Sequence, residues 1–238
     1  IQYQPNMGST SAIAYCPSNT DVMVRYAQNE AKGYYSTDAG STWTEMTIQQ
    51  GGQKAAITQL EDGTYRIFCG KSYSDDFGAT WNNITGISTS STVYIQVDPQ
   101  NPQYVYSAGN DNNSYDPTCK PNNYLFVSSD YGKTFEKVTL GSYDKIEDYG
   151  RICAAGNGTV YAPAGSSGLY VTEDYGKTVS EFDNVDQCFA VGVGAAKDSS
   201  SPLTIYIWGQ ANGSGITGIY RSVNGGFSLG KNNDDENQ

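Results

Sequence analysis

Histidine is absent from this chain of 238 residues, and only 16% of its residues carry a charge. Without histidine the chain cannot supply a Ser-His-Asp triad, a Cys-His nucleophile or a histidine-ligated metal. The sequence also lacks any apolar run long enough to span a bilayer, so no membrane contact is predicted. Any hydrolysis by this chain would have to depend on carboxylates.

Cysteines are few and scattered, and no two of them have Cys-x-x-Cys spacing. They are Cys16, Cys69, Cys119, Cys153 and Cys188. This arrangement argues against a zinc site, and we predict neither a metal nor a cofactor. Because the count is odd, at least one thiol is free or is paired outside this chain.

Acidic residues outnumber basic ones, 25 to 14, which gives a net charge of -11. An acidic surface is repelled by phosphate backbones and by anionic lipids, so nucleic acid and membranes are excluded as partners. The 27 glycines and 20 tyrosines are typical of an all-β secreted protein with many turns. No signal peptide opens the chain, so we expect a mature, processed or excised segment of a secreted protein.

One eight-residue pattern, Ser-x-Asp-x-Gly-x-Thr-aromatic, occurs five times and organises the chain. Its copies are STDAGSTW (36–43), SDDFGATW (74–81), SSDYGKTF (128–135), TEDYGKTV (172–179) and the divergent SVNGGFSL (222–229). This is the Asp-box, known from sialidases, sortilin-type receptors and polysaccharide-degrading propellers. Successive copies are 38 to 54 residues apart, a spacing that suits one β-propeller blade per copy.

The residue types in the box suit a tight hairpin. The aspartate can accept hydrogen bonds from backbone N–H groups just after it, and the glycine can adopt a positive φ. A catalytic or calcium-binding role for each aspartate is the alternative, but an active site needs its residues once, whereas the box recurs in every repeat. We therefore predict a structural role for Asp38, Gly40, Asp76, Gly78, Asp130, Gly132, Asp174 and Gly176.

Short alternating segments surround each box. In the first repeat, SAIAYC (11–16), VMVRYA (22–27) and GYYS (33–36) precede the box, and TEMTI follows it. Four strands per repeat predict an antiparallel propeller blade. We predict an all-β fold, a single and incomplete propeller domain over residues 1–238 with about five four-stranded blades. The predicted blades span residues 9–52, 53–90, 91–142, 143–187 and 188–238.

Longer loops of uneven length are predicted at the rim opposite the boxes, because strand direction alternates within a blade. Such loops on a rigid scaffold commonly carry function. They are rich in Asp and Tyr, including Asp183 and Asp186, and Trp208 is expected at a strand end beside them. Aromatic rings can stack on sugars and carboxylates can bind hydroxyls, although both residue types are also common in secreted β loops. The predicted polysaccharide-binding residues are Tyr115, Asp116, Tyr143, Asp144 and Trp208.

From about Ser9 onward, the chain resembles the C-terminal propeller of glycoside hydrolase family 74. Its members are xyloglucan-cleaving endoglucanases and reducing-end-specific oligoxyloglucan hydrolases. The resemblance is carried by SAIAYCPSNTDVMVRYA (11–27), GIYRSVNGG (218–226) and NDDENQ (233–238). It implies two seven-bladed propellers that face one another across a substrate cleft, each providing one catalytic aspartate.

The chain departs from the family pattern at several positions. Asn237 stands where the family has histidine, Asn224 replaces a box aspartate and Leu229 replaces a box tryptophan. The family's second-propeller catalytic segment has no counterpart here. Inverting glycosidases, which the resemblance implies, need two carboxyl groups roughly 6.5 to 9.5 Å apart. No such pair can be identified, so the catalytic residues remain unassigned.

Three functions are consistent with these features. The favoured one is a segment of a secreted, inverting xyloglucan- or β-1,4-glucan-degrading hydrolase that forms one wall of the polysaccharide cleft, with a second propeller of the same protein as partner. On that hypothesis the isolated chain binds a β-glucan weakly and does not hydrolyse it. The alternatives are a non-catalytic carbohydrate-binding propeller and a sortilin-like protein-binding propeller.

Overall fold

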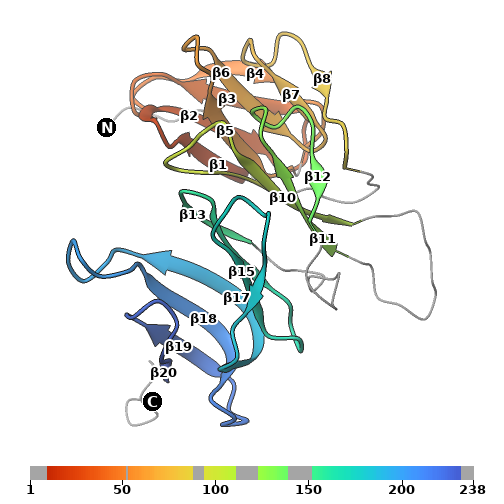
Figure 1. The fold of residues 1–238 in the computed structure, drawn as a ribbon. Helices are drawn as coiled ribbons and strands as arrows, with labels where there is room; N and C mark the ends of the chain where they lie inside the picture. The colour runs from red at the N-terminus through yellow and green to blue at the C-terminus, as the bar shows by residue number, and fades with distance from the viewer. Residues whose placement is uncertain (1–9, 52, 88–93, 111–122, 139–151, 232–238) are drawn as a thin grey trace. The chain divides into compact units, whose positions relative to one another are not determined.

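The computed structural model describes residues 10–51, 53–87, 94–110, 123–138 and 152–231 (Figure 1). Within these ranges twenty strands form five four-stranded sheets, and neighbouring strands run antiparallel. The same ranges contain no helix, and hence none that could cross a membrane. The prediction of an all-β protein built from four-stranded blades is confirmed.

Each sheet takes its four strands in sequence order. The first contains β1 (Thr10–Cys16), β2 (Asn19–Ala27), β3 (Lys32–Ser36) and β4 (Thr44–Thr47). The second contains β5 (Ala55–Gln59), β6 (Tyr65–Cys69), β7 (Ser72–Ser74) and β8 (Asn82–Asn83). The third contains β9 (Tyr94–Val97), β10 (Val105–Asn110), β11 (Asn123–Ser128) and β12 (Glu136–Lys137).

The last two sheets follow the same plan. The fourth contains β13 (Cys153–Gly156), β14 (Thr159–Pro163), β15 (Leu169–Thr172) and β16 (Ser180–Glu181). The fifth contains β17 (Val185–Gly194), β18 (Thr204–Ala211), β19 (Gly218–Ser222) and β20 (Gly230–Lys231). β17 thus begins slightly before the predicted blade boundary at residue 188.

The chain divides into two compact units. One comprises residues 1–114 with 126–137, and the other comprises residues 115–125 with 138–238. The first unit contains sheets β1–β4 and β5–β8 and most of β9–β12. The second contains sheets β13–β16 and β17–β20.

Hydrophobic cores lie between consecutive sheets. In the first unit, Val24 and Tyr26 of β2 belong to one buried cluster with Ile57 and Ile67 of the next sheet. In the second unit, Tyr161 and Leu169 of the fourth sheet pack with Ile205 and Ile207 of the fifth. Because strand residues alternate between the two faces, each sheet can bury one face against its predecessor and the other against its successor.

A buried arginine links the second and third sheets of the first unit. Arg66 of β6 is 1% exposed, and its Nε and Nη2 each donate to a carboxylate oxygen of Asp75 at 2.7 Å. Its Nη1 donates to the backbone oxygen of Tyr131, in the box after β11, at 3.0 Å. Its guanidinium also lies 4.2 Å from the ring centroid of Tyr73. All three nitrogens of this buried cation are therefore bonded.

Four cysteines are free thiols, and Cys119 lies outside the described residues. The free thiols are Cys16, Cys69, Cys153 and Cys188. Burial raises the pKa of Cys69 and Cys153, and it raises that of Cys188 to about 12. These three thiols therefore stay protonated and unreactive at neutral pH.

Candidate functional site

The first Asp-box is closed by hydrogen bonds that involve the side chains of Ser36, Asp38 and Thr42. Ser36 Oγ donates to Asp38 Oδ1 at 2.8 Å and accepts the backbone N–H of Gly40 at 2.8 Å. The Asp38 carboxylate accepts the Thr42 backbone N–H at 2.8 Å and its hydroxyl at 2.6 Å. Both carboxylate oxygens are thus engaged within the hairpin.

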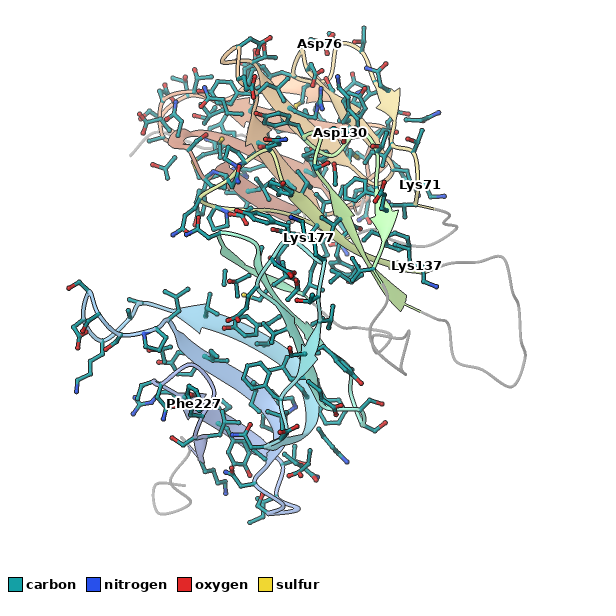
Figure 2. All side chains as sticks on the ribbon, in the orientation of Figure 1. Lys71, Asp76, Asp130, Lys137, Lys177 and Phe227 are labelled. Atoms are coloured by element: carbon teal, nitrogen blue, oxygen red, sulfur yellow. The ribbon has the colours of Figure 1, made fainter. Side chains whose placement is uncertain are left out.

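The same bonds recur in the boxes of Asp76, Asp130 and Asp174; Figure 2 labels the first two. In the fifth box, Asn224 Oδ1 accepts the Ser228 N–H at 3.0 Å, and its Nδ2 donates to Ser228 Oγ at 2.9 Å. An amide can therefore complete this hairpin by reversing one hydrogen bond. Carboxylates occupied in this way are poorly placed to act as acids or bases.

Two consecutive residues of every box have positive φ. Gly40 has φ 80° and Ala39, immediately before it, has φ 56°. In the next three boxes the corresponding non-glycine residues are Phe77, Tyr131 and Tyr175, with φ from 50° to 63°. The box pattern predicts the left-handed glycine but not the left-handed residue before it, whose backbone conformation is strained for a residue with a Cβ atom.

Three box hairpins, those of the first, third and fourth sheets, lie beside the connection between the first two strands of their own sheet. The backbone N–H of the residue before the box glycine donates to a carbonyl of that connection or, in the first sheet, to one near the start of β2. These bonds are Ala39 to Asp21 O at 2.9 Å, Tyr131 to Gln103 O at 3.0 Å, and Tyr175 to Gly158 O at 3.2 Å. The boxes and these turns therefore share one end of their sheets, as strand alternation requires.

Box hairpins also contact the outermost strand of the preceding sheet. Trp81 Nε1 donates to Thr47 O of β4 at 3.1 Å. Phe135 N donates to Thr85 O, just after β8, at 3.0 Å. In the second unit, Asn184, which follows β16, donates its amide to Gly226 O at 2.9 Å. The box thus closes its own turn and also joins successive sheets.

Hydrogen bonding lowers the pKa of all four box aspartates. At Asp38 and Asp76 the largest cause is the hydroxyl of the box threonine. At Asp130, burial raises the pKa, but the bonds from the box threonine and serine outweigh it. At Asp174 the backbone N–H and then the hydroxyl of Thr178 lower the pKa to about 2. The folded state therefore favours the ionised form.

Acid should destabilise the protein through these carboxylates. Because their folded pKa lies below the unfolded value of 3.8, their contribution is complete above about pH 5. It is lost as the pH falls toward about 2, through the folded pKa of Asp174. We expect the urea midpoint to drop over this window, and to drop less in Asp174→Asn, which cannot titrate there. Identical pH profiles for the two proteins would contradict this account.

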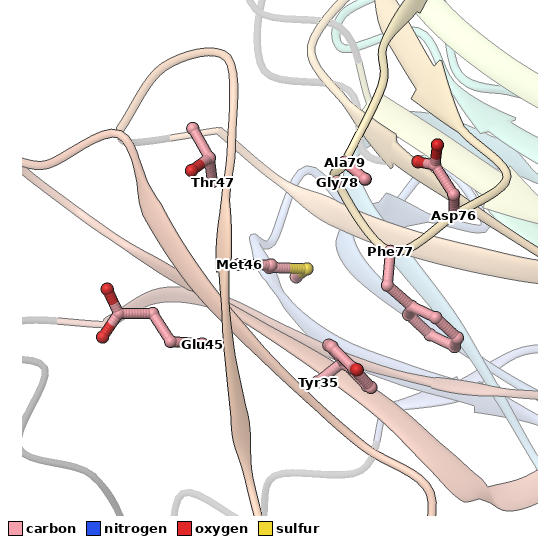
Figure 3. A pocket seen from close by; sticks show the side chains of 8 residues that line it. All are labelled: Tyr35, Glu45, Met46, Thr47, Asp76, Phe77, Gly78 and Ala79. Atoms are coloured by element: carbon pink, nitrogen blue, oxygen red, sulfur yellow. The ribbon is translucent and has the colours of Figure 1, made fainter.

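An open pocket of about 460 Å³ lies at the junction of the first two sheets (Figure 3). Tyr35 and Glu45–Thr47 form one side, and the box residues Asp76–Ala79 form the other. The Tyr35 and Phe77 rings stack with centroids 4.2 Å apart. Glu45 is bonded to Lys32 at 3.0 Å and to the Tyr34 hydroxyl at 3.2 Å. The carboxylates of Glu45 and Asp76 are already bonded to protein groups. We therefore assign this pocket to the packing between the two sheets and not to a binding site.

Four of the five predicted polysaccharide-binding residues, Tyr115, Asp116, Tyr143 and Asp144, lie outside the described residues. The predicted rim loop that contains Asp183 and Asp186, residues 182–187, contacts the loop that follows β18 in the second unit. Asp186 accepts the Gly213 N–H at 2.8 Å, and Asn184 O accepts the Asn212 N–H at 3.0 Å. Asp186 therefore holds a neighbouring loop in place.

Trp208, the fifth predicted residue, lies inside a strand. It is the fifth residue of β18 and pairs with Ala190 on one side and Ile219 on the other. Its expected place at a strand end is wrong, because β18 continues to Ala211. The side chain is 47% exposed on the broad face of the last sheet.

No group of three or more His, Cys, Asp or Glu side chains in the described ranges could hold a metal ion.

Comparisons with known proteins find the Asp-box repeat and relatives from one enzyme family. The BNR/Asp-box repeat family matches residues 34–45, and the BNR-Asp box repeat family matches residues 125–138. A xyloglucanase of a Paenibacillus species is 25% identical over 98% of this chain and 23% of its own length.

The solved structure of the Niastella koreensis GH74 enzyme is similar with a TM-score of 0.77 and 31% identity, over 98% of this chain and 32% of that one. The chain resembles a β-propeller segment of glycoside hydrolase family 74. A probable oligoxyloglucan-reducing end-specific xyloglucanase of Neosartorya fischeri is 23% identical over 98% of this GH74-like segment and 32% of its own length. The segment thus spans about a third or less of each of these relatives.

Proposed function

We propose that this GH74-like segment belongs to a secreted glycoside hydrolase that degrades xyloglucan or another β-1,4-glucan. In this proposal it forms one wall of the polysaccharide cleft and faces a second propeller of the same protein. The supporting observation is its similarity to the Niastella koreensis GH74 enzyme across 98% of the chain at 31% identity. Two curated relatives matched over the same extent are named as xyloglucanases.

The proposed sugar contacts are Tyr115 and Tyr143, with Asp116 and Asp144 as hydrogen-bond acceptors. All four lie in loops predicted on the rim opposite the boxes. A tyrosine can present its ring face to a sugar while its hydroxyl remains hydrated. Trp208 is left out of this set because it lies within β18 rather than in a rim loop.

The isolated chain should bind a glucan weakly and should not cleave it. In a cleft built from two propellers, a chain with only one wall leaves much of the sugar surface in water. Inverting hydrolysis needs an opposed acid and base across the scissile bond. The box carboxylates cannot supply them, because the hairpins already engage their oxygens.

Calorimetric titration of a xyloglucan oligosaccharide tests this site. Loss of one stacked ring should cost about 1 kcal/mol, so Tyr115→Ala and Tyr143→Ala should each bind about five-fold more weakly. Phe227→Ala is the control, since Phe227 is 91% exposed on a box hairpin. Unchanged affinity in both tyrosine variants would place the site elsewhere. Absence of binding by the unaltered chain would favour the protein-binding alternative.

A further inference from the structure

The connection between β18 and β19, residues 212–217, lies at the end of the last sheet opposite its box. β17 and β18 lie side by side and antiparallel (Figure 1), and the start of β17 meets the end of β18 where Val185 pairs with Ala211. The box is at the other end, because its first residue, Ser222, pairs with Ile205 near the start of β18. We name residues 212–217 the β18–β19 loop.

Hydrogen bonds hold the β18–β19 loop near both of its ends. Asn212 donates its backbone N–H to Asn184 O at 3.0 Å and its side-chain amide to Leu229 O at 2.8 Å. Near the other end, the buried Tyr220 donates its hydroxyl to Ile216 O at 2.7 Å. A loop that is already fixed in this way loses little conformational entropy when a ligand binds to it.

Asp186 supplies a further bond, from a position created by a β-bulge. Val185 pairs with Ala211 and Gln187 pairs with Gln210, so Asp186 is the extra residue of β17 between these pairs. A bulge of this kind changes the direction of a side chain. Asp186 Oδ2 accepts the backbone N–H of Gly213 at 2.8 Å. Because Asp186 is exposed, this bond serves the loop and not the packing of the core.

Two glycines leave the backbone of the loop accessible. Gly213 and Gly215 both have φ 64°, and a Cβ atom at either position would meet nothing within 4 Å. Glycines allow a ligand to approach the backbone closely. Ile216, next to the second glycine, is 51% exposed. An apolar side chain beside an accessible backbone suits a sugar ring, which has apolar C–H faces and hydroxyl groups around its edge.

We infer that the β18–β19 loop contacts the glucan chain, and that Asp186 is the positioning residue that holds the loop for this contact. The inference rests on the proposed function, which identifies the glucan as the ligand. Ile216 packs on a C–H face of a sugar ring, and the backbone at Gly215 bonds to its hydroxyls. Asp186 does not touch the sugar, because its carboxylate acts through the N–H of Gly213.

Calorimetric titration of a xyloglucan oligosaccharide into variants of the 238-residue chain tests the positioning role. Asp186→Ala removes the acceptor and should weaken binding about five-fold, the effect of one lost hydrogen bond. Asp186→Asn keeps an acceptor oxygen and should bind like the unaltered chain. Hydrogen exchange at the Gly213 amide should accelerate in Asp186→Ala and remain slow in Asp186→Asn.

Asp198→Ala is the matched control. Asp198 is also exposed and accepts a backbone N–H at 3.0 Å, that of Ser200. It belongs to the connection between β17 and β18, at the box end of the same sheet. Its replacement should leave the affinity for the oligosaccharide unchanged.

Gly215→Asn tests the sugar contact without altering Asp186. Asparagine adopts a positive φ more readily than most residues, and its side chain would occupy the open space beside the backbone. We expect binding to weaken about five-fold or more while the Tm changes little.

Three results would overturn the inference. One is unchanged affinity in Asp186→Ala; the proposed function would stand if Tyr115→Ala or Tyr143→Ala bound more weakly in the same titration. Another is an equal loss of affinity in Asp186→Asn and Asp186→Ala, since the charge and not the bond to Gly213 would then matter. The last is absence of binding by the unaltered chain, which would contradict the proposed function as well.

Discussion

Replacing Asp75 by asparagine is expected to destabilise the first unit by about 3 kcal/mol, the range found when one partner of a buried ion pair is removed. Asp75 supplies both carboxylate oxygens to Arg66, whose side chain is 1% exposed. An asparagine amide oxygen can still accept one hydrogen bond, but the guanidinium loses its counter-charge and one of its two acceptors at this position, and its other partners are one carbonyl and one aromatic ring. It cannot recover hydration without opening the packing between the second and third sheets.

Replacing the arginine of this pair should lower the free energy of unfolding by less than replacing the aspartate. Arg66→Met keeps the buried aliphatic volume and leaves Asp75, which is 37% exposed and can be hydrated. Urea unfolding followed by Trp43 and Trp81 fluorescence, both within the first unit, gives the two values. If Arg66→Met proves as destabilising as Asp75→Asn, burial of an uncompensated cation is not the cause.

Gly132→Ala is expected to destabilise the same unit by about 3 kcal/mol, from backbone strain and steric overlap together. Gly132 has φ 76°, and a Cβ atom there would lie 2.6 Å from Cε1 of Phe68. Phe68 is 1% exposed, so its ring has little room to move away. A shift of the ring would disturb the packing of the third sheet's box on the second sheet.

Gly63→Ala separates the two causes. Gly63 has φ 87°, but a Cβ atom there would meet nothing within 4 Å, so only the backbone strain remains. We expect a loss of about 1 kcal/mol for this variant by urea unfolding. Equal losses for Gly63→Ala and Gly132→Ala would show that the contact with Phe68 contributes nothing.

The repeated hairpins were predictable because their chemistry is local. The box serine, aspartate, glycine and threonine bond to one another within a few residues, so the pattern alone specifies the turn. The positive φ of Phe77 and Tyr131 was not predictable, since nothing in an aromatic side chain indicates a left-handed backbone. The two-residue turn imposes that conformation on them.

Contacts between sheets were harder to predict from the sequence than the hairpins were. Arg66 stands in the apolar strand YRIFC, and an arginine there would ordinarily be expected to face solvent. Its burial depends on Asp75 and on Tyr131, which is far away in sequence. Trp208 was misplaced for a related reason, because the end of β18 is set by pairing with β17 rather than by a local signal.

The candidate sugar site was predicted from composition and loop placement, and these cannot fix side-chain geometry. Tyr115, Asp116, Tyr143 and Asp144 remain predictions, because they fall outside the described ranges. The enzyme-family resemblance, by contrast, was visible in the residues around the first box and the last. It is confirmed by similarity over 98% of the chain.

Reducing-sugar release from xyloglucan, measured side by side for the 238-residue chain and the full-length parent, tests the central claim most directly. The account predicts turnover by the parent and none by the chain, because in the proposed function this segment forms one wall of the cleft and its box carboxylates are engaged within their hairpins. Clear turnover by the isolated chain would show that it contains a catalytic carboxylate pair of its own. Absence of turnover by the parent on xyloglucan and on other β-glucans would contradict the assignment to a glucan-degrading hydrolase.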